Sequence, residues 1–304
     1  NEEGYCSFGV SCDYTKPAAE CARIVVAEVN KQMPFIGGDN LIHVTKLDYI
    51  VPVDRPLVEI PPAPIGEVEQ RIGEICAELI EDGDTLQIGI GAIPDAVLQC
   101  LQGRKDLGLH TEMFTDGVMH MIQSGHVTGE KKTLHHRKVA SSIIMGSKAL
   151  YDFIDHNEMI EMYPVHHMND PYVIGQNDRM VSINSCLEID LYGQVASEAI
   201  GLEQFSGTGG QVDYLRGAKR SRGGRSILAF TSTAKGGTVS RIVPVLPPGA
   251  TVTSGRNEVD YIATEYGAVR LRGLTLRERA LALVSIAHPD FRLGLMAAIE
   301  ERFS

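Results

Sequence analysis

Three stretches of the sequence combine residue types that could perform chemistry, and the first is a pair of glycines after a buried strand. The predicted strand Thr85–Ile90 contains Gly89 and leads into Gly91, and a helix is predicted to begin at Pro94. Glycines at such a turn let backbone N–H groups approach a ligand, and the helix N-terminus adds positive potential. The stretch could therefore hold a phosphate or an oxyanion. It lacks the third glycine of a dinucleotide fingerprint, and a tight structural turn is the more common explanation of such a pattern.

The second stretch places a carboxylate at the end of a predicted inner strand. Glu112 lies near the end of the strand predicted over Leu109–Phe114, and a helix follows with Asp116 as its predicted N-cap. Open α/β sheets bind ligands at this edge, and apolar neighbours on the strand would partly desolvate the carboxylate. Desolvation makes a carboxylate more reactive as long as it stays ionised. Glu112 is therefore a candidate nucleophile, although a cap or an ion pair is the commoner role of such a residue.

The third stretch is a glycine loop followed by a cluster of cations. Gly207, Gly209 and Gly210 precede a short predicted helix, and five basic residues follow between residues 216 and 225. The chain as a whole carries 28 Lys and Arg against 39 Asp and Glu, with a formal net charge of -11. Such a local reversal of charge indicates an anionic ligand with several phosphates. A solvated basic loop explains the same pattern equally well.

Composition excludes several other classes of protein. The acidic balance argues against general nucleic-acid binding, and no apolar run approaches the roughly 18 residues of a membrane span. The six cysteines form no CxxC pair, which favours free thiols and a reducing, cytoplasmic compartment. The chain has no HxxxH or HExxH pattern, so we expect no metal site. It also lacks the GxSxG pattern of a serine hydrolase.

The order of predicted elements indicates an α/β fold with an open, mostly parallel sheet. A helix is predicted over residues 17–30, and a proline-rich connector ends near residue 62. Strands and helices are then predicted to alternate with short connections up to Tyr163. After residue 180 the sequence becomes rich in predicted strands and glycines, and two predicted helices close the chain. We therefore predict an N-terminal part over residues 1–62 and a main domain over residues 63–304.

Taken together, these stretches resemble the class I CoA-transferases, in the branch of the 4-hydroxybutyrate CoA-transferases and the acetyl-CoA hydrolase/transferase family. No single stretch is decisive, but their order is specific. The resemblance covers essentially the whole chain through GYCSFGVSCDY (4–14), GIGAIPDAV (89–97), HTEMFTDG (110–117), SINSCLEIDLYGQV (182–195), SGTGGQVDY (206–214) and VDYIATEYGAVRLRG (259–273).

The resemblance implies ping-pong acyl chemistry on a glutamate, which by position is Glu112. The carboxylate attacks an acyl-CoA, the released CoA thiolate attacks the resulting anhydride, and a glutamyl-CoA thioester remains for a second acid to resolve. The competing candidate for the nucleophile is Glu188, and Asp190 beside it is open to a structural role. The expected activity is transfer of CoA between short acids such as acetate, butyrate or 4-hydroxybutyrate.

Further roles follow from the same resemblance. The backbone amides of Gly89 and Gly91 would form an oxyanion hole, the loop glycines Gly207, Gly209 and Gly210 would pack against CoA, and Asn169 would lie near the acyl oxygen. The basic residues Lys219, Arg220, Arg222 and Arg225 could meet the CoA phosphates, which is an inference from composition alone. The family implies CoA as a substrate, no metal or redox cofactor, and a homodimer.

Two alternatives stay open at this point. An acyl-CoA hydrolase would use the same glutamate with water as the acceptor, and a non-catalytic CoA-binding subunit would bind CoA without turnover. The chain begins with Asn1, and residues 1–62 match only the last part of the family's N-terminal domain. We therefore expect that a preceding portion, and with it part of the wall of the active site, is missing.

Overall fold

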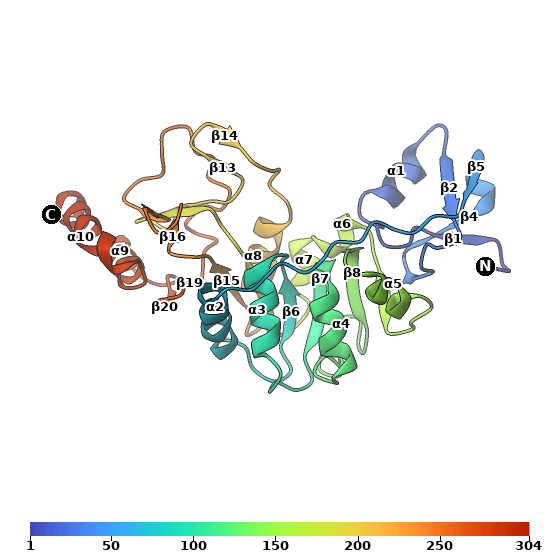
Figure 1. The fold of residues 1–304 in the computed structure, drawn as a ribbon, viewed down its shortest axis with the longest axis horizontal. Coiled ribbons are helices and arrows are strands. Elements are labelled where there is room, and N and C mark those ends of the chain that lie inside the picture. Colours follow the sequence, from blue (N-terminus) through green and yellow to red (C-terminus); the bar gives the residue numbers. More distant parts are fainter. Residues whose placement is uncertain (304) are drawn as a thin grey trace.

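A nine-stranded sheet forms the centre of the computed structural model, which describes residues 1–303 (Figure 1). The strand order is β20-β19-β15-β10-β6-β7-β8-β9-β3, and every neighbouring pair is parallel except the β19–β20 hairpin. This arrangement confirms the expected α/β fold class. The strands are β3 (Gly37–Gly38), β6 (Thr85–Ile88), β7 (Gly108–Phe114), β8 (Val139–Ile144), β9 (Ile160–Met162), β10 (Met180–Asn184), β15 (Arg225–Ala229), β19 (Tyr261–Thr264) and β20 (Gly267–Arg270).

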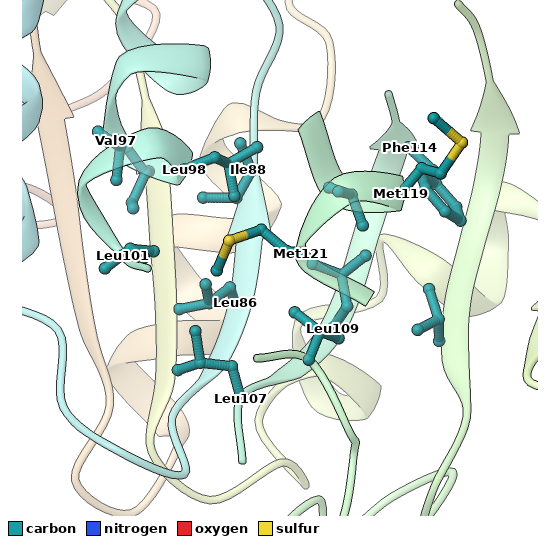
Figure 2. Close-up of a cluster of buried hydrophobic side chains, with 14 of the residues drawn as sticks. Leu86, Ile88, Val97, Leu98, Leu101, Leu107, Leu109, Phe114, Met119 and Met121 are labelled. Atoms are coloured by element: carbon teal, nitrogen blue, oxygen red, sulfur yellow. The ribbon is translucent and has the colours of Figure 1, made fainter. Parts of the chain in front are cut away.

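Helices cover the sheet because each returns the chain to the start of the next parallel strand. In Figure 1, four of them stand side by side in front of the strands: α2 (Glu67–Glu78), α3 (Ala92–Cys100), α4 (Asp116–Gln123) and α5 (Lys148–Ile154). Figure 2 shows how α3 and α4 bury their apolar stripes against β6 and β7, with Leu98 and Met121 over Leu86 and Leu109. Three further helices lie near these strands: α6 (Val165–Met168) packs on β7 and β8, α8 (Gln211–Arg220) packs on β10 and β15, and α7 (Pro171–Ile174) packs against α6 and α8.

The N-terminal part differs from the predicted single helix over residues 17–30. The helix α1 (Thr15–Cys21) ends early, and residues 26–30 form a strand that pairs in parallel with residues 49–53. The β-branched run from Ile24 to Val26 favours extended backbone, and the partner strand supplies hydrogen bonds that a local pattern cannot reveal. The elements here are β1 (Tyr5–Ser7), β2 (Val26–Asn30), β4 (Leu41–His43), the 3-10 turn η1 (Val44–Lys46) and β5 (Tyr49–Val53).

Residues 54–66 form no regular element, and Figure 1 shows this connector crossing the middle of the molecule to reach α2. The strand β3 comes from the N-terminal part but pairs with β9 at the edge of the main sheet, so the sheet includes residues from both sides of residue 62. The predicted domain boundary near residue 62 stays a prediction. Among residues 1–303, no helix is both long and apolar enough to cross a membrane. The six cysteines are free thiols, and Cys12, Cys76 and Cys186 are buried.

The last third of the chain adds short strands and two helices. A three-stranded sheet has the order β12-β11-β18, and two hairpins stand beside it. The helix α9 begins with a capping box between Thr275 and Glu278. The elements are β11 (Glu188–Asp190), β12 (Val195–Ala196), β13 (Ala199–Ile200), β14 (Glu203–Gln204), β16 (Thr233–Ala234), β17 (Val239–Ser240), β18 (Ile242–Val243), α9 (Leu276–Ser285) and α10 (Pro289–Phe303).

Candidate active site

Glu112 lies near the carboxyl end of β7, where the parallel strands of the sheet end together. Its side chain is half-buried, and the Nδ2 group of Asn169 donates a 2.6 Å hydrogen bond to its Oε2 atom. Asn169 directly follows α6, and its Oδ1 atom is buried with no partner among residues 1–303. The structure therefore brings together two of the predicted residues, although 57 positions separate them in the sequence.

The surroundings act on the charge of Glu112 in two opposing ways. Burial raises its pKa, and the negative charges of Asp13 and Asp213 add to that effect, whereas the hydrogen bond from Asn169 lowers the pKa. Burial weakens the solvation of the carboxylate, while the amide favours the ionised form. A carboxylate in this setting is a stronger nucleophile than an exposed one, and the amide helps to keep it ionised.

Glu112 faces a cavity of about 420 Å³ between α6, α7 and the start of α8. The glycine loop forms one wall of this cavity, in which Gly209 has a left-handed backbone conformation with φ of 56°. The other wall consists of short polar side chains. The lining residues with polar groups are Glu112, His166, Asn169, Asp170, Thr208, Gly209, Gly210 and Asp213.

Gly210 makes the closest approach to the carboxylate. It is buried at the N-cap of α8, and a Cβ atom at this position would overlap Oε2 of Glu112 and the amide of Asn169. Glycine is required here because there is no space for a side chain. The backbone φ of -87° is one that any residue can adopt. The first N–H groups of a helix have no carbonyl partner within the helix, so the start of α8 directs positive potential toward the carboxylate.

The first glycine pair is only partly available as an oxyanion hole. The N–H group of Gly89 donates to the carbonyl of Ile183 at 3.1 Å, because it continues the β6–β10 pairing by one residue. This hydrogen bond corrects the expectation for Gly89, since an engaged donor cannot also hold an oxyanion. Gly91 is the N-cap of α3, with φ of 110°, and borders a different cavity of about 790 Å³ that Met113 also lines. Gly91 therefore stays a prediction.

The basic cluster is at the wrong end of the sheet for the role that composition suggested. Arg225 begins β15 and donates to the buried Asp84 just before β6, so both lie at the edge where the strands start. The helix α8 separates this end from Gly210 by ten residues, or about 15 Å. The predicted contacts with CoA phosphates are therefore not supported.

The other members of this cluster are also engaged. Lys219 Nζ donates to the carbonyl of Asn257, the Arg220 guanidinium lies over the ring of Tyr172, and Arg222 pairs with Asp178. These contacts explain the local charge reversal as structural pairing. The binding role expected for Lys219, Arg220, Arg222 and Arg225 therefore stays a prediction that these contacts do not support.

The competing carboxylates lie outside the cavity. Glu188 is 8% exposed on β11, burial raises its pKa, and its Oε1 atom has no partner among residues 1–303. Asp190 accepts hydrogen bonds from the backbone N–H groups of Tyr192 and Gln194, which is a turn-forming role. Asp116 was expected as an N-cap, but Thr115 holds that position and Asp116 accepts from Ser147.

Sequence reasoning missed four polar residues of the cavity wall. His166 lies within α6, and Asp170 directly follows Asn169 as the N-cap of α7. Thr208 lies in the glycine loop, and Asp213 lies in the first turn of α8. His166 and Asp170 belong to no recognisable motif, whereas Thr208 and Asp213 lie in the stretch SGTGGQVDY (206–214) without a role assigned to them. Their only signal in the sequence was proximity to Asn169 and to the glycine loop.

Comparison with known protein families gives two matches along the chain. A family model described as the acetyl-CoA hydrolase/transferase C-terminal domain matches residues 146–299. A second model, the acetyl-CoA hydrolase/transferase N-terminal domain, matches residues 1–62. Glu112 lies between these ranges, and Asn169 and Gly210 lie within the first.

Several curated proteins and solved structures resemble the whole chain. It is 59% identical to the 4-hydroxybutyrate coenzyme A transferase of Clostridium kluyveri, over 99% of this chain and 70% of that protein. It is 37% identical to the butyryl-CoA:acetate CoA-transferase of Anaerostipes caccae, over 99% of this chain and 70% of that protein. The crystal structure of 4-hydroxybutyrate CoA-transferase from Porphyromonas gingivalis aligns with a TM-score of 0.91 and 64% identity, over 100% of this chain and 73% of that one.

Proposed function

The chain belongs to the acetyl-CoA hydrolase/transferase family, and from this membership and the site geometry we propose that it is an acyl-CoA:carboxylate CoA-transferase that works through a covalent intermediate on Glu112. The observation that carries the assignment of the nucleophile is the half-buried carboxylate that Asn169 holds at the cavity. Relatives that share 37% to 59% identity with the chain are named CoA-transferases.

The proposed reaction is a series of substitutions at carbonyl carbons. An Oε atom of Glu112 attacks the thioester carbonyl of the acyl-CoA, the C–S bond breaks, and CoA leaves as a thiolate. The thiolate then attacks the glutamyl carbonyl of the mixed anhydride, the acid product leaves as a carboxylate, and a glutamyl-CoA thioester remains. A second carboxylate reverses these steps and leaves as its CoA ester. The sequence consumes no proton and no water, and coenzyme A enters it as a substrate.

Two groups beside Glu112 are suited to the oxyanions that form in these steps. Asn169 offers its Nδ2 group, and Gly210 opens α8 directly over the same carboxylate. A well-placed donor of this kind contributes about 3 kcal/mol to transition-state stabilisation in other enzymes. We assign these two groups to the glutamyl carbonyl oxygen, and Gly207 and Gly209 to contacts with the CoA thioester end.

The substrate class follows from the relatives. Their names include 4-hydroxybutyrate, butyrate, acetate and succinate as acids. We therefore propose that short-chain carboxylates exchange CoA on this protein. A name of acetyl-CoA hydrolase occurs among the relatives at only 29% identity, in Yarrowia lipolytica, so the transferase reading is favoured over hydrolysis.

The first test is peptide mass spectrometry after incubation of the protein with butyryl-CoA. We expect a CoA-sized adduct on the peptide that contains Glu112, and we expect CoA release to require an added acid such as acetate. Glu112→Gln should abolish turnover and the adduct, while CoA affinity stays within a few-fold, because the amide keeps the shape but is not a nucleophile. Retained turnover in this variant would transfer the assignment to Glu188, and CoA release without an acceptor acid would favour a hydrolase.

A further inference from the structure

Two buried side chains donate to one backbone carbonyl directly behind the proposed nucleophile. His110 Nε2 and the Tyr214 hydroxyl each lie 3.0 Å from the carbonyl oxygen of Met168. Met168 is fully buried at the end of α6, and His110 and Tyr214 are 0% and 1% exposed. A carbonyl oxygen has two lone pairs, so this contact satisfies it completely.

Each member of this contact is adjacent to one group of the site. Asn169 directly follows Met168 in the chain. His110 lies two residues before Glu112 on β7, so both side chains point to the same face of the sheet, where α6 and α8 lie. Tyr214 lies one turn after Gly210, and its N–H group donates to the Gly210 carbonyl at 3.1 Å.

We propose that His110 and Tyr214 are positioning residues for the reaction, and that their shared hydrogen bonds to the Met168 carbonyl hold Asn169 and the start of α8 against Glu112. We call this set of three residues the Met168 clamp. The inference rests on the proposed function of Glu112 as the nucleophile. It assigns to the clamp no contact with substrate, since neither side chain lines the cavity.

Both donors keep their protons over the working range of pH. Burial, and then the charge of Lys132, lower the pKa of His110 well below its usual value, so its ring is neutral. Because a carbonyl only accepts, the single ring proton is on Nε2, and Nδ1 is left without a partner among residues 1–303. Burial and the charges of Glu112 and Asp213 raise the pKa of Tyr214, so its hydroxyl stays a donor.

The N–H group of Asn169 donates to the Val165 carbonyl at 2.8 Å, and Val165 is joined to Asp13, but neither contact holds the Asn169 side chain. The Oδ1 atom of Asn169 has no partner within residues 1–303, and α6 comprises only four residues, which cannot hold an orientation by itself. A misplacement of about 1 Å at a reacting group can cost about 100-fold in rate. Loss of one donor leaves the other in place, so single variants should be milder than the double variant.

The test compares the unchanged protein with Tyr214→Phe and His110→Leu, which each remove one donor, and with their double variant, while His110→Gln serves as the variant that keeps a donor at this position. We expect Tyr214→Phe to lower kcat about 10-fold with KM changed less than about threefold, and to slow adduct formation on Glu112 equally. His110→Gln should retain most of the activity, because its amide can donate from nearly the same position as Nε2. The double variant should lose more than either single variant.

A pH profile separates positioning from general loss of packing. If Tyr214→Phe loosens Asn169, the acid limb of kcat/KM should move to higher pH, because Glu112 loses the hydrogen bond that favours its ionised form. The matched control is Tyr151→Phe, which removes a hydroxyl that donates to the Val58 carbonyl at 2.8 Å from a side chain 8% exposed. We expect this control to keep kcat and the pH profile.

The outcomes are distinguishable from failure of the proposed function. An adduct on Glu112 in the unchanged protein, with Tyr214→Phe indistinguishable from Tyr151→Phe in kcat and pH profile, overturns the clamp and leaves the function standing. Absence of the adduct in the unchanged protein overturns the function itself, and the clamp with it. If the double variant does not fold, the two single variants still decide the question.

Discussion

At the scale of single residues, the hydrogen bond between Asn169 and Glu112 is the interaction on which the proposed chemistry depends most directly. It favours the ionised carboxylate, and burial opposes it. Together they leave the Glu112 carboxylate partly desolvated, while one hydrogen bond still favours its ionised form. The acid limb of the pH profile of kcat/KM should report the pKa of this group in the free protein.

Asn169→Ala removes the amide and should therefore raise the pKa of Glu112. The carboxylate is active when ionised, so activity should be lost as the pH falls through this pKa, and the acid limb should move to higher pH in the variant. We also expect kcat at neutral pH to fall about 100-fold, from the loss of one oxyanion donor. The measurement is a series of initial rates from about pH 4, near the ordinary pKa of a carboxyl group, up to about pH 8.

The control for this variant is Asn157→Ala, which removes an amide that donates to the Phe153 carbonyl before β9. It should leave the pH profile of the protein in place. An acid limb that stays in place in Asn169→Ala would contradict the assigned role of the amide, whatever the change in kcat.

At the scale of elements, the main sheet was predictable from the sequence, whereas the N-terminal strand β2 was not. The predicted strands and helices between Thr85 and Tyr163 agree with β6 to β9 within about two residues, because each carries its own periodicity and its own turn residues. The strand β2 was predicted as helix, because its stability comes from pairing with β5, which lies 23 residues further along the chain. Local pattern carries no information about such a partner.

The candidate site was predictable for a different reason in each of its parts. The place of Glu112 followed from the rule that ligands bind at the carboxyl end of parallel strands. Its contact with Asn169 was implied only by family resemblance, since nothing in the sequence between them indicates that α6 returns to β7. For the basic cluster, composition does not show that Asp178 pairs with Arg222 and that Asp84 pairs with Arg225.

The ion pair between Arg225, at the start of β15, and Asp84 should contribute to the stability of the protein but not to its catalytic activity. Arg225 donates to Asp84, which is 0% exposed and also accepts from Arg179 Nε at 2.9 Å. Removal of one partner leaves a buried charge with weaker compensation, so Arg225→Met should lower the free energy of unfolding by about 3 kcal/mol. Urea denaturation measures this change.

In the same variant, the KM for acyl-CoA should stay within about twofold, because this ion pair lies at the opposite edge of the sheet from Glu112. Lys148→Ala breaks an exposed pair with Asp152 and should cost less than about 0.5 kcal/mol. A large rise in KM for Arg225→Met would restore the phosphate-binding role that the structure does not support.

At the scale of the whole molecule, the N-terminal part contributes directly to the environment of Glu112. The N–H groups of Cys12 and Asp13 donate to the carbonyl of Ser142 on β8, and the carbonyl of Asp13 accepts from the N–H group of Val165, which begins α6. The strand β3 adds to the same sheet at its edge. The two parts of the chain are therefore joined at the short helix that also holds Asn169.

Asp13, in the N-terminal part, acts on Glu112 through its negative charge. Its negative charge raises the pKa of Glu112, so Asp13→Asn should lower that pKa and move the acid limb of kcat/KM to lower pH, the opposite direction to Asn169→Ala. Asparagine suits the position because Asp13 has a φ of 28°, and asparagine adopts positive φ more readily than most residues. Asp106→Asn, also at positive φ with 54°, makes the same change of charge at the N-terminal edge of the sheet and should not move the limb. Opposite shifts in the two site variants would show that one titrating group, Glu112, sets the acid limb, whereas shifts in the same direction would mean that another group limits the rate.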